Sequence, residues 1–269
     1  MIIFKSINKL VKEVNFKAGV GFVPTMGSLH KGHISLIKKS QKKCQKTIVS
    51  IFVNPSQFNK INDYKKYPRS LKKDLLILKK LRIDYVLIPS IKDIFKNKKM
   101  MKIRINRKYK ILCAKFRPGH FEGVLGVINQ FLKKIKAKYM FLGEKDFQQF
   151  FLINNFIKKK FKTKVITCRT VRNRNYLAYS SRNILLKPNQ IELASNVAKI
   201  LLKYKSSIKK DFKNKNKISS IIKNFSKMNI KIQYLEIKNK KNLSSNFNKN
   251  NFKIFVAFFI NGVRLIDNF

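Results

Sequence analysis

Short apolar runs and longer amphipathic stretches take turns along the first two thirds of the chain. The short runs predict strands buried on both faces, because such strands need apolar residues at nearly every position. The longer stretches predict helices, because their apolar residues recur every three or four positions. This order predicts an α/β fold, a parallel sheet with helices on both faces. The predicted strands lie at residues 20–25, 47–53, 84–88, 139–142 and 164–169, and the predicted helices at residues 31–44, 69–82, 122–136 and 146–160.

From about residue 183 the pattern changes to long helices followed by strands. Asn261 and Gly262 lie between two apolar runs, which predicts a β-hairpin. We therefore predict a small C-terminal α+β domain and divide the chain into residues 1–178 and 179–269. The predicted helices lie at residues 188–205 and 218–228, the strands at 231–237, 252–259 and 262–266, and a solvated loop at 238–251.

Polar or glycine-containing segments follow several of the predicted strands. In a parallel sheet the ligand crevice lies beyond the carboxyl ends of the strands, so we expect these segments to meet at one site. They are Thr25–His33, Asn54–Phe58, Gly143–Gln149 and Arg172–Arg182.

His30 and His33 follow a strand and a glycine turn and lie at the start of a predicted helix. Their spacing puts both rings on one helix face, and unpaired backbone N–H groups and the positive end of the macrodipole stabilise phosphate there. Gly32 between them allows phosphate to approach the backbone. The pattern thus favours a nucleotide triphosphate site. Two ordinary histidines are the alternative; a zinc site would need further ligands, and no Cys or carboxylate cluster lies nearby.

Two amides and a proline form a second candidate segment. Pro55 ends a strand and fixes a turn, so that the amides of Asn54 and Gln57 can face the crevice. An ordinary Asn-Pro turn is the alternative. Gln149, in the first turn of another predicted helix, can face the same pocket.

Lys145 and Asp146 lie at a helix start, where the macrodipole opposes a lysine unless an anion is present. That mismatch favours a phosphate partner. Ser180, Ser181 and Arg182 offer two hydroxyls and a guanidinium, which suit triphosphate oxygens. A solvated turn is the alternative for this last group.

The composition changes this picture little. The 269-residue chain has 62 basic and 12 acidic residues, a net charge of +50 that would ordinarily indicate a nucleic acid. Lysine predominates and is spread over nearly every segment, so we expect only non-specific, salt-sensitive RNA binding. The three cysteines are far apart and support no disulfide framework. With no apolar run of signal or membrane-spanning length, we expect a cytoplasmic protein without a membrane partner.

A set of ordered motifs resembles the pantothenate synthetase family over nearly the whole chain. The His-x-Gly-His element alone marks the wider nucleotidylyltransferase superfamily, whereas the ordered set is specific. The motifs are Pro24-Thr-Met-Gly-Ser-Leu-His-Lys-Gly-His33, Phe52-Val-Asn-Pro-Ser-Gln-Phe58, Tyr67-Pro-Arg69, Gly119-His-Phe-Glu-Gly123, Gly143-Glu-Lys-Asp-Phe-Gln-Gln149, Ser180-Ser-Arg-Asn183, Tyr234-Leu-Glu236 and Arg264-Leu-Ile-Asp-Asn268.

The resemblance implies an AMP-forming ligase that joins (R)-pantoate to β-alanine through a pantoyl adenylate, with ATP as co-substrate, Mg²⁺, and a homodimer. It implies a Rossmann-like nucleotide- and pantoate-binding domain at 1–178 and a lid domain at 179–269. His33 is implied as catalytic acid, with His30 and Lys145 beside it, and no protein ligand to a metal. Gln57 and Gln149 are implied to hold pantoate, and Gln57 also β-alanine. The residues implied to bind ATP are Met26, Gly27, Ser28, Leu29, His30, Lys31, Gly32, His33, Gly143, Glu144, Lys145, Asp146, Val171, Tyr179, Ser180, Ser181 and Arg182.

A few positions depart from the family pattern. Asn175 and Tyr176 stand where Asp-Gly is usual, Tyr179 stands where Met or Leu is usual, and Lys31 replaces a common acidic residue. Two alternatives to the ligase stay open: another nucleotidylyltransferase, and a basic nucleic-acid-binding module. Uncharged amides at the pantoate positions favour a hydroxy acid over a phosphorylated substrate, and a nucleic-acid module would interleave aromatics with arginine on one face.

Overall fold

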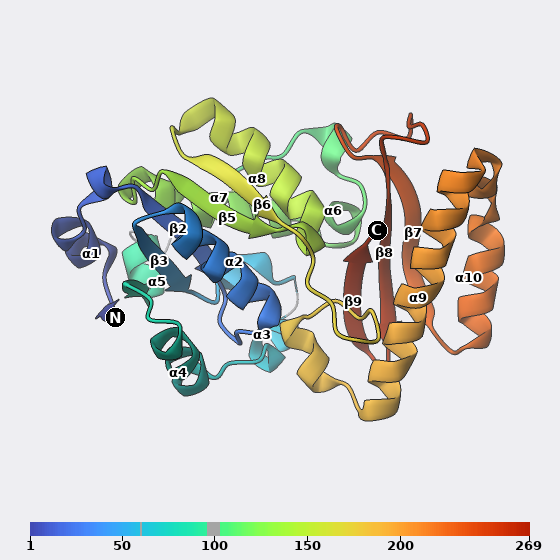
Figure 1. The fold of residues 1–269 in the computed structure, drawn as a ribbon, viewed down its shortest axis with the longest axis horizontal. Coiled ribbons are helices and arrows are strands. Elements are labelled where there is room, and N and C mark those ends of the chain that lie inside the picture. Colours follow the sequence, from blue (N-terminus) through green and yellow to red (C-terminus); the bar gives the residue numbers. More distant parts are fainter. Residues whose placement is uncertain (60, 96–102) are drawn as a thin grey trace. The chain divides into compact units, whose positions relative to one another are not determined.

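The computed structural model describes residues 1–59, 61–95 and 103–269. Its chain forms two compact units (Figure 1). The first comprises Met1–Lys110 and Ala114–Arg169, and the second comprises Ile111–Cys113 and Thr170–Phe269. The predicted assignment of binding and lid roles to residues 1–178 and 179–269 stays a prediction.

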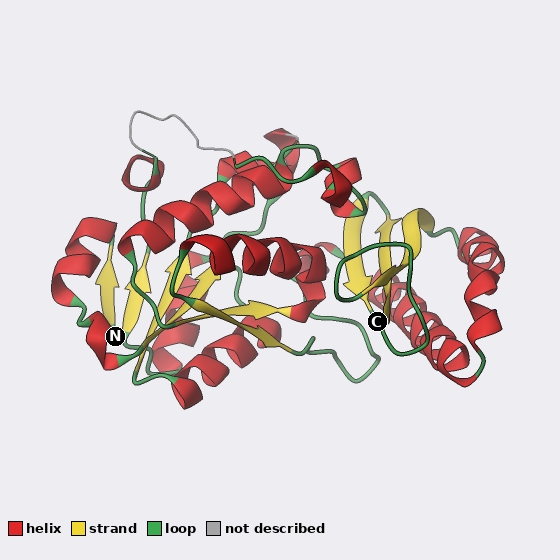
Figure 2. Cartoon of the chain, turned by 90° about the horizontal axis from the view of Figure 1, so that it is seen from above, coloured by secondary structure: helices red, strands yellow, loops and turns green. Residues whose placement is uncertain are grey.

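A parallel sheet surrounded by helices forms the centre of the first unit (Figure 2). It has six strands, in the order β1-β4-β3-β2-β5-β6. Every strand predicted here is present. The edge strand β1 was not predicted, because its three residues are too few to show a pattern. The strands are β1 (Ile2–Phe4), β2 (Val20–Thr25), β3 (Lys46–Ile51), β4 (Tyr85–Leu87), β5 (Tyr139–Gly143) and β6 (Lys164–Cys168).

Helices cover both faces of this sheet. Successive residues of a strand point to opposite faces: the ring of Phe22 in β2 packs against Phe131 at 5.4 Å, whereas Val23 joins an apolar cluster with Leu36 and Ile37. The predicted helices are confirmed as α2, α4, α7 and α8. The helices of this unit are α1 (Ile7–Glu13), α2 (Lys31–Lys43), α3 (Ile61–Lys66), α4 (Leu71–Lys80), α5 (Ile91–Ile94), α7 (His120–Lys134) and α8 (Phe147–Lys160); α6 (Cys113–Phe116) begins in the second unit.

The second unit has its own core between two helices and an antiparallel sheet in the order β7-β8-β9. The predicted hairpin is confirmed, with Asn261 and Gly262 both at positive φ (+46° and +77°). Helix α9 continues beyond the predicted residue 205, because buried Ile208 extends its apolar face by one turn from Tyr204. The elements are α9 (Pro188–Lys210), α10 (Ile218–Lys227), β7 (Lys231–Asn239), β8 (Phe252–Ile260) and β9 (Val263–Asn268).

Strand order explains how distant motifs of the first unit share one edge. Strand β2 pairs in parallel with β3 on one side and β5 on the other. The segments that follow these three strands therefore leave the sheet at neighbouring carboxyl ends, where the prediction from sequence puts the ligand crevice.

Candidate active site

A tight turn connects β2 to helix α2. Gly27 and Ser28 both have positive φ, +76° and +50°. The hydroxyl of Thr25 accepts a hydrogen bond from the Gly27 N–H at 3.2 Å and donates one to the Ser50 carbonyl at 2.7 Å. This turn reverses the chain so that His30 becomes the N-cap of α2.

His30 and His33 cap the helix reciprocally. The Nδ1 of His30 accepts from the Gly32 N–H at 3.1 Å, and the Nδ1 of His33 accepts from the His30 N–H at 3.4 Å. Their ring centroids lie 4.0 Å apart. Because each Nδ1 accepts, the neutral form of each ring carries its proton on Nε2.

This geometry corrects the prediction that the N–H groups at the start of the helix are unpaired. The N–H groups of His30 and Gly32 bond to imidazole nitrogens instead. Each ring thereby accepts a backbone donor on one side and offers an Nε2–H donor on the other. These two amides are therefore occupied, and the remaining N–H donor of each neutral ring is on Nε2.

Both imidazoles are held neutral at pH 7. Burial, followed by the charges of His33 and Lys145, lowers the pKa of His30 to about 3. Burial and the charge of Lys145 lower the pKa of His33 to about 4. Both residues are nevertheless half-buried rather than fully enclosed.

Lys145 lies in a 3-10 turn, Glu144–Asp146, directly after β5 and before α8. Its side chain is 17% exposed, and its Nζ lies 3.7 Å from the carboxylate of Asp146. The predicted position at a helix start is thus observed, and the ammonium is close enough to lower the pKa of both histidines. Gln149 lies in the first turn of α8.

Asn54 and Gln57 have different surroundings. The prediction that the amide of Asn54 faces the crevice is wrong: Asn54 is fully buried, its Oδ1 accepts from the Ser56 N–H at 3.2 Å, and its Nδ2 donates to the Gly123 carbonyl at 3.2 Å. An amide that follows a strand and precedes proline caps the next turn more readily than it faces outward. Gln57 ends that turn, Pro55–Gln57, and is buried.

Two residues that the sequence reasoning did not single out hold Gln57. Its carbonyl accepts from Arg117 Nη2 at 3.0 Å and from His120 Nδ1 at 2.7 Å. Arg117 Nη1 lies 3.0 Å from His120 Nε2, and because a guanidinium only donates, this Nε2 accepts and Nδ1 carries the proton. The third histidine is therefore the opposite tautomer to His30 and His33.

Val171, Tyr179, Ser180, Ser181 and Arg182 belong to the second unit. They flank or follow a short hairpin that is closed by an antiparallel bridge between Arg172 and Ala178. Two of the departures from the family pattern, Asn175 and Tyr176, lie within this hairpin. Tyr176 takes the left-handed conformation, φ +70°, that glycine would take more easily.

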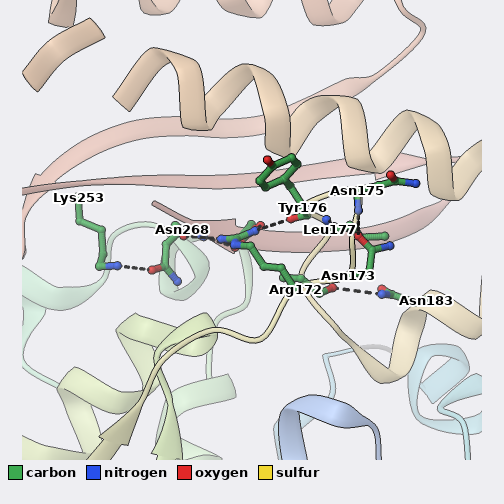
Figure 3. A network of polar contacts seen from close by, with 10 residues as sticks. Arg172, Asn173, Asn175, Tyr176, Leu177, Asn183, Lys253 and Asn268 are labelled. Carbon is green, nitrogen blue, oxygen red and sulfur yellow. Dashed lines mark hydrogen bonds and ion pairs between the residues drawn. The ribbon is translucent and has the colours of Figure 1, made fainter. Parts of the chain in front are cut away.

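Strand β9 anchors that hairpin (Figure 3). Arg172 donates to both carboxylate oxygens of Asp267, at 2.6 and 2.9 Å, and to the Asn268 carbonyl at 3.1 Å. The Asn173 side chain accepts from the N–H groups of Asn175 and Leu177. The course of residues 172–180 is therefore fixed by bonds within the second unit.

A parallel sheet with a histidine-capped helix and a lysine at its carboxyl edge is typical of a nucleotide-binding α/β enzyme of Rossmann-like fold. The family described as pantoate-beta-alanine ligase matches residues 3–269. The chain belongs to this family of ligases. A curated relative, pantothenate synthetase of Francisella tularensis subsp. novicida, is 42% identical over 264 residues, covering 97% of this chain and 92% of the relative.

Solved structures agree with this assignment. A pantoate-beta-alanine ligase from Francisella tularensis, solved with beta-gamma ATP and beta-alanine, is 39% identical, with a TM-score of 0.87 and coverage of 100% of this chain and 97% of that one. Pantothenate synthetase from Thermus thermophilus is 27% identical, with a TM-score of 0.92 and coverage of 100% and 99%.

Proposed function

We propose that this protein condenses (R)-pantoate with β-alanine at the expense of ATP, releasing AMP and pyrophosphate. The observation that carries the proposal is the pair of neutral imidazoles capping α2 beside Lys145. The family match over residues 3–269 supplies the substrates. A solved structure of a similar ligase contains beta-gamma ATP and beta-alanine, which supports ATP and β-alanine as substrates.

The first step is attack of the pantoate carboxylate on the α-phosphorus of ATP. The bond from this phosphorus to the α,β-bridging oxygen breaks, and pyrophosphate leaves with its electron pair. Negative charge then grows on the bridging and non-bridging oxygens. The Nε2–H groups of His30 and His33 and the ammonium of Lys145 supply the donors that stabilise it.

His33 acts on the bridging oxygen and His30 on the neighbouring phosphate oxygens. The Nε2–H of His33 donates a hydrogen bond to the bridging oxygen as negative charge grows there, while the ring stays neutral because its Nδ1 accepts the His30 N–H. The residues proposed to contact ATP are Met26, Gly27, Ser28, Leu29, His30, Lys31, Gly32, His33, Gly143, Glu144, Lys145, Asp146, Val171, Tyr179, Ser180, Ser181 and Arg182.

Gln57 and Gln149 hold pantoate. Amides donate to and accept from the hydroxyls of a hydroxy acid without adding charge beside the attacking carboxylate. In the second step the β-alanine amine, bordered by Gln57, attacks the pantoyl carbonyl, and AMP leaves. No covalent enzyme intermediate is needed.

Mg²⁺ fits this site as a companion of the nucleotide. Among the residues described, no group of three or more His, Cys, Asp and Glu is arranged to hold a metal ion. The ion commonly keeps waters and binds substrate phosphates with one or two carboxylates, and Asp146, whose side chain is 46% exposed, is the candidate. When bound, Mg²⁺ supplies charge neutralisation of the triphosphate.

A cytoplasmic location and a homodimer complete the proposal. The three cysteines are unpaired thiols, as in a reducing compartment. Within the described part of the chain, no helix is long and apolar enough to cross a membrane. Sedimentation velocity would detect the dimer.

Product analysis tests the proposal. Purified protein incubated with ATP, pantoate and β-alanine is expected to form pantothenate and AMP in equal amounts, and omission of any one substrate is expected to abolish pantothenate. Turnover of unrelated acids without any product from pantoate would instead indicate a different nucleotidylyltransferase. Salt-resistant, sequence-selective RNA binding without ligase activity would indicate the nucleic-acid-binding class.

A further inference from the structure

Asp74 of helix α4 binds the turn that leads into the histidine pair. Its Oδ2 accepts from the Ser28 N–H at 2.8 Å and its Oδ1 from the Leu29 N–H at 2.7 Å. The residue is 2% exposed, and neither its sequence context nor the proposed chemistry gives it a role.

The arrangement requires a carboxylate. Two backbone donors converge on the two side-chain oxygens, and both oxygens must accept. An asparagine of the same shape would present one NH₂ group to a backbone N–H. A buried carboxylate is costly unless hydrogen bonds compensate it, and in the described structure this one is compensated by the turn itself rather than by a lysine or arginine.

The turn held by Asp74 is conformationally demanding. Gly27 and Ser28 are both left-handed, and a Cβ added to Gly27 would lie 2.9 Å from Asp74 Oδ2 and 3.1 Å from Ile51 Cγ2. Left-handed conformations cost an L-residue such as serine roughly 1 kcal/mol. Bonds from outside the turn are therefore needed to keep it in this conformation.

Helix α4 gives Asp74 a fixed position. Leu78, one turn further along, is fully buried in the same apolar cluster as Val23 of β2 and Ile37 of α2. The carboxylate is thus anchored to the core on which β2 and α2 pack. The turn is therefore bound to α4, and α4 packs on the same core as β2 and α2, the two elements that the turn connects.

We propose that Asp74 is a positioning residue for the nucleotide site: its carboxylate fixes the turn at residues 27–29, and this makes His30 the N-cap and directs both Nε2–H groups outward. The inference rests on the proposed binding of ATP at the histidine pair. It also assigns the N–H groups of Ser28 and Leu29 to Asp74, so these amides do not bind phosphate.

Asp74→Asn tests the proposal. Loss of one charge-assisted bond and the new N–H to N–H repulsion are expected to lower kcat/KM for ATP between about 10- and 100-fold. In the ATP-free protein, ¹⁵N spectra of the imidazoles are expected to change from pure Nε2–H tautomers to a mixture, and the pKa of at least one ring is expected to rise toward 6.5. A purely structural role would leave the histidine spectra unaltered.

Asp84→Asn is the matched control. Asp84 likewise accepts a backbone N–H, that of Thr47 at 3.0 Å, but at the amino ends of β3 and β4. It is expected to leave kcat/KM for ATP and the histidine spectra as in the parent. The proposal would be overturned if Asp74→Asn kept the histidine spectra of the parent and a kcat/KM for ATP within threefold of the parent. It would also be overturned if Asp84→Asn changed the spectra and kcat/KM as much as Asp74→Asn does.

A second variant guards against misfolding of Asp74→Asn. Gly27→Ala adds the Cβ that meets Asp74 Oδ2 and is expected to produce the same histidine changes without ATP. A parental histidine spectrum in Gly27→Ala would overturn the proposal. Absence of pantothenate formation by the parent would refute the proposed function alone, because the spectra need no substrate.

Discussion

At the scale of single residues, the proton positions of three imidazoles follow from their hydrogen bonds. His30 and His33 accept at Nδ1, whereas His120 donates from Nδ1 to the Gln57 carbonyl. In the neutral form the first two rings carry their proton on Nε2, the nitrogen that does not cap the helix. The third has both nitrogens occupied by protein groups and positions a neighbour.

Removal of the His33 ring is expected to slow the first step. His33→Ala eliminates an Nε2–H donor and should lower kcat by about 10²–10³ with less effect on KM, the scale for one donor that acts in the transition state. Lys145→Ala should act in the same range. Steady-state kinetics of pyrophosphate release would measure both, and near-parental kcat in both variants would contradict the assigned roles.

The lowered pKa values of His30 and His33 make the stability of the folded protein depend on pH. The folded rings titrate at about 3 and 4, below the 6.5 of an unfolded histidine. Between about pH 4 and 6.5 the unfolded chain therefore binds more protons, and the free energy of unfolding falls as the pH drops through this window. The expected loss from pH 7 to 5 is on the order of 2 kcal/mol per ring.

Urea denaturation at several pH values would measure this dependence. The double variant His30→Gln, His33→Gln is the control, because its amide oxygens can still accept the capping N–H groups but do not titrate. It should show a flatter dependence than the parent. Identical pH profiles for the two proteins would show that the rings do not carry the effect.

At the scale of elements, the 3-10 turn that carries Gln57 is clamped by the first turn of α7. A Cβ on Gly123 would lie 2.5 Å from the Ser56 carbonyl oxygen, a backbone atom with no easy way to move. The Gln57 carbonyl is held from the same helix end by Arg117 and His120. Helix α7 therefore sets where the proposed pantoate amide lies.

Gly123→Ala is expected to displace that turn. KM for pantoate should rise at least about 10-fold, since an amide shifted by about 1 Å loses its hydrogen bond geometry, while KM for ATP should change little. The KM for ATP of the same variant is the internal control, because the residues proposed to contact ATP lie outside this turn and outside α7. Equal increases in both KM values for Gly123→Ala would argue against a specific effect on pantoate.

Backbone strain at Tyr176, in the hairpin of the second unit, can be relieved by a substitution. Tyr176 is left-handed and 51% exposed, so Tyr176→Gly loses little packing and should raise the free energy of unfolding by roughly 1 kcal/mol. The neighbouring Asn175→Gly should give no gain, because Asn175 does not have positive φ. Thermal denaturation would compare the two, and a destabilised Tyr176→Gly would contradict this account.

Elements with a strong periodic pattern were predictable from the sequence, and contacts across the fold were not. The spacing of apolar residues alone predicted the buried strands and the long helices of the first unit. The role of Asp74 was not predictable in this way, because its hydrogen-bond partners are 45 and 46 residues away in the sequence. A carboxylate one turn from buried Leu78 on an apolar helix face was the available signal.

At the scale of the whole molecule, the parallel sheet brings separated motifs of the first unit to one edge. The strand order puts β2 between β3 and β5, so the histidine pair, Gln57 and Lys145 all follow adjacent carboxyl ends. The sequence predicted this convergence within the first unit. It could not predict that residues 170–178 belong to the second unit, because Arg172 is bound by Asp267 near the opposite end of the chain.

The large positive charge is also a property of the whole molecule. A net charge of +50 attracts polyanions at low salt regardless of sequence, and it gives no information about the site. The groups proposed to act on the α-phosphate and to hold pantoate are two neutral imidazoles, two amides and one half-buried ammonium. Charge thus favours encounter with anionic substrates, and geometry selects among them.

Pantoate-dependent exchange of labelled pyrophosphate into ATP tests the central claim most directly, because it isolates adenylate formation. The account predicts exchange with pantoate present and β-alanine absent, and its loss in His33→Ala. Exchange that requires β-alanine, or that proceeds without pantoate, would contradict a pantoyl adenylate formed at the histidine pair.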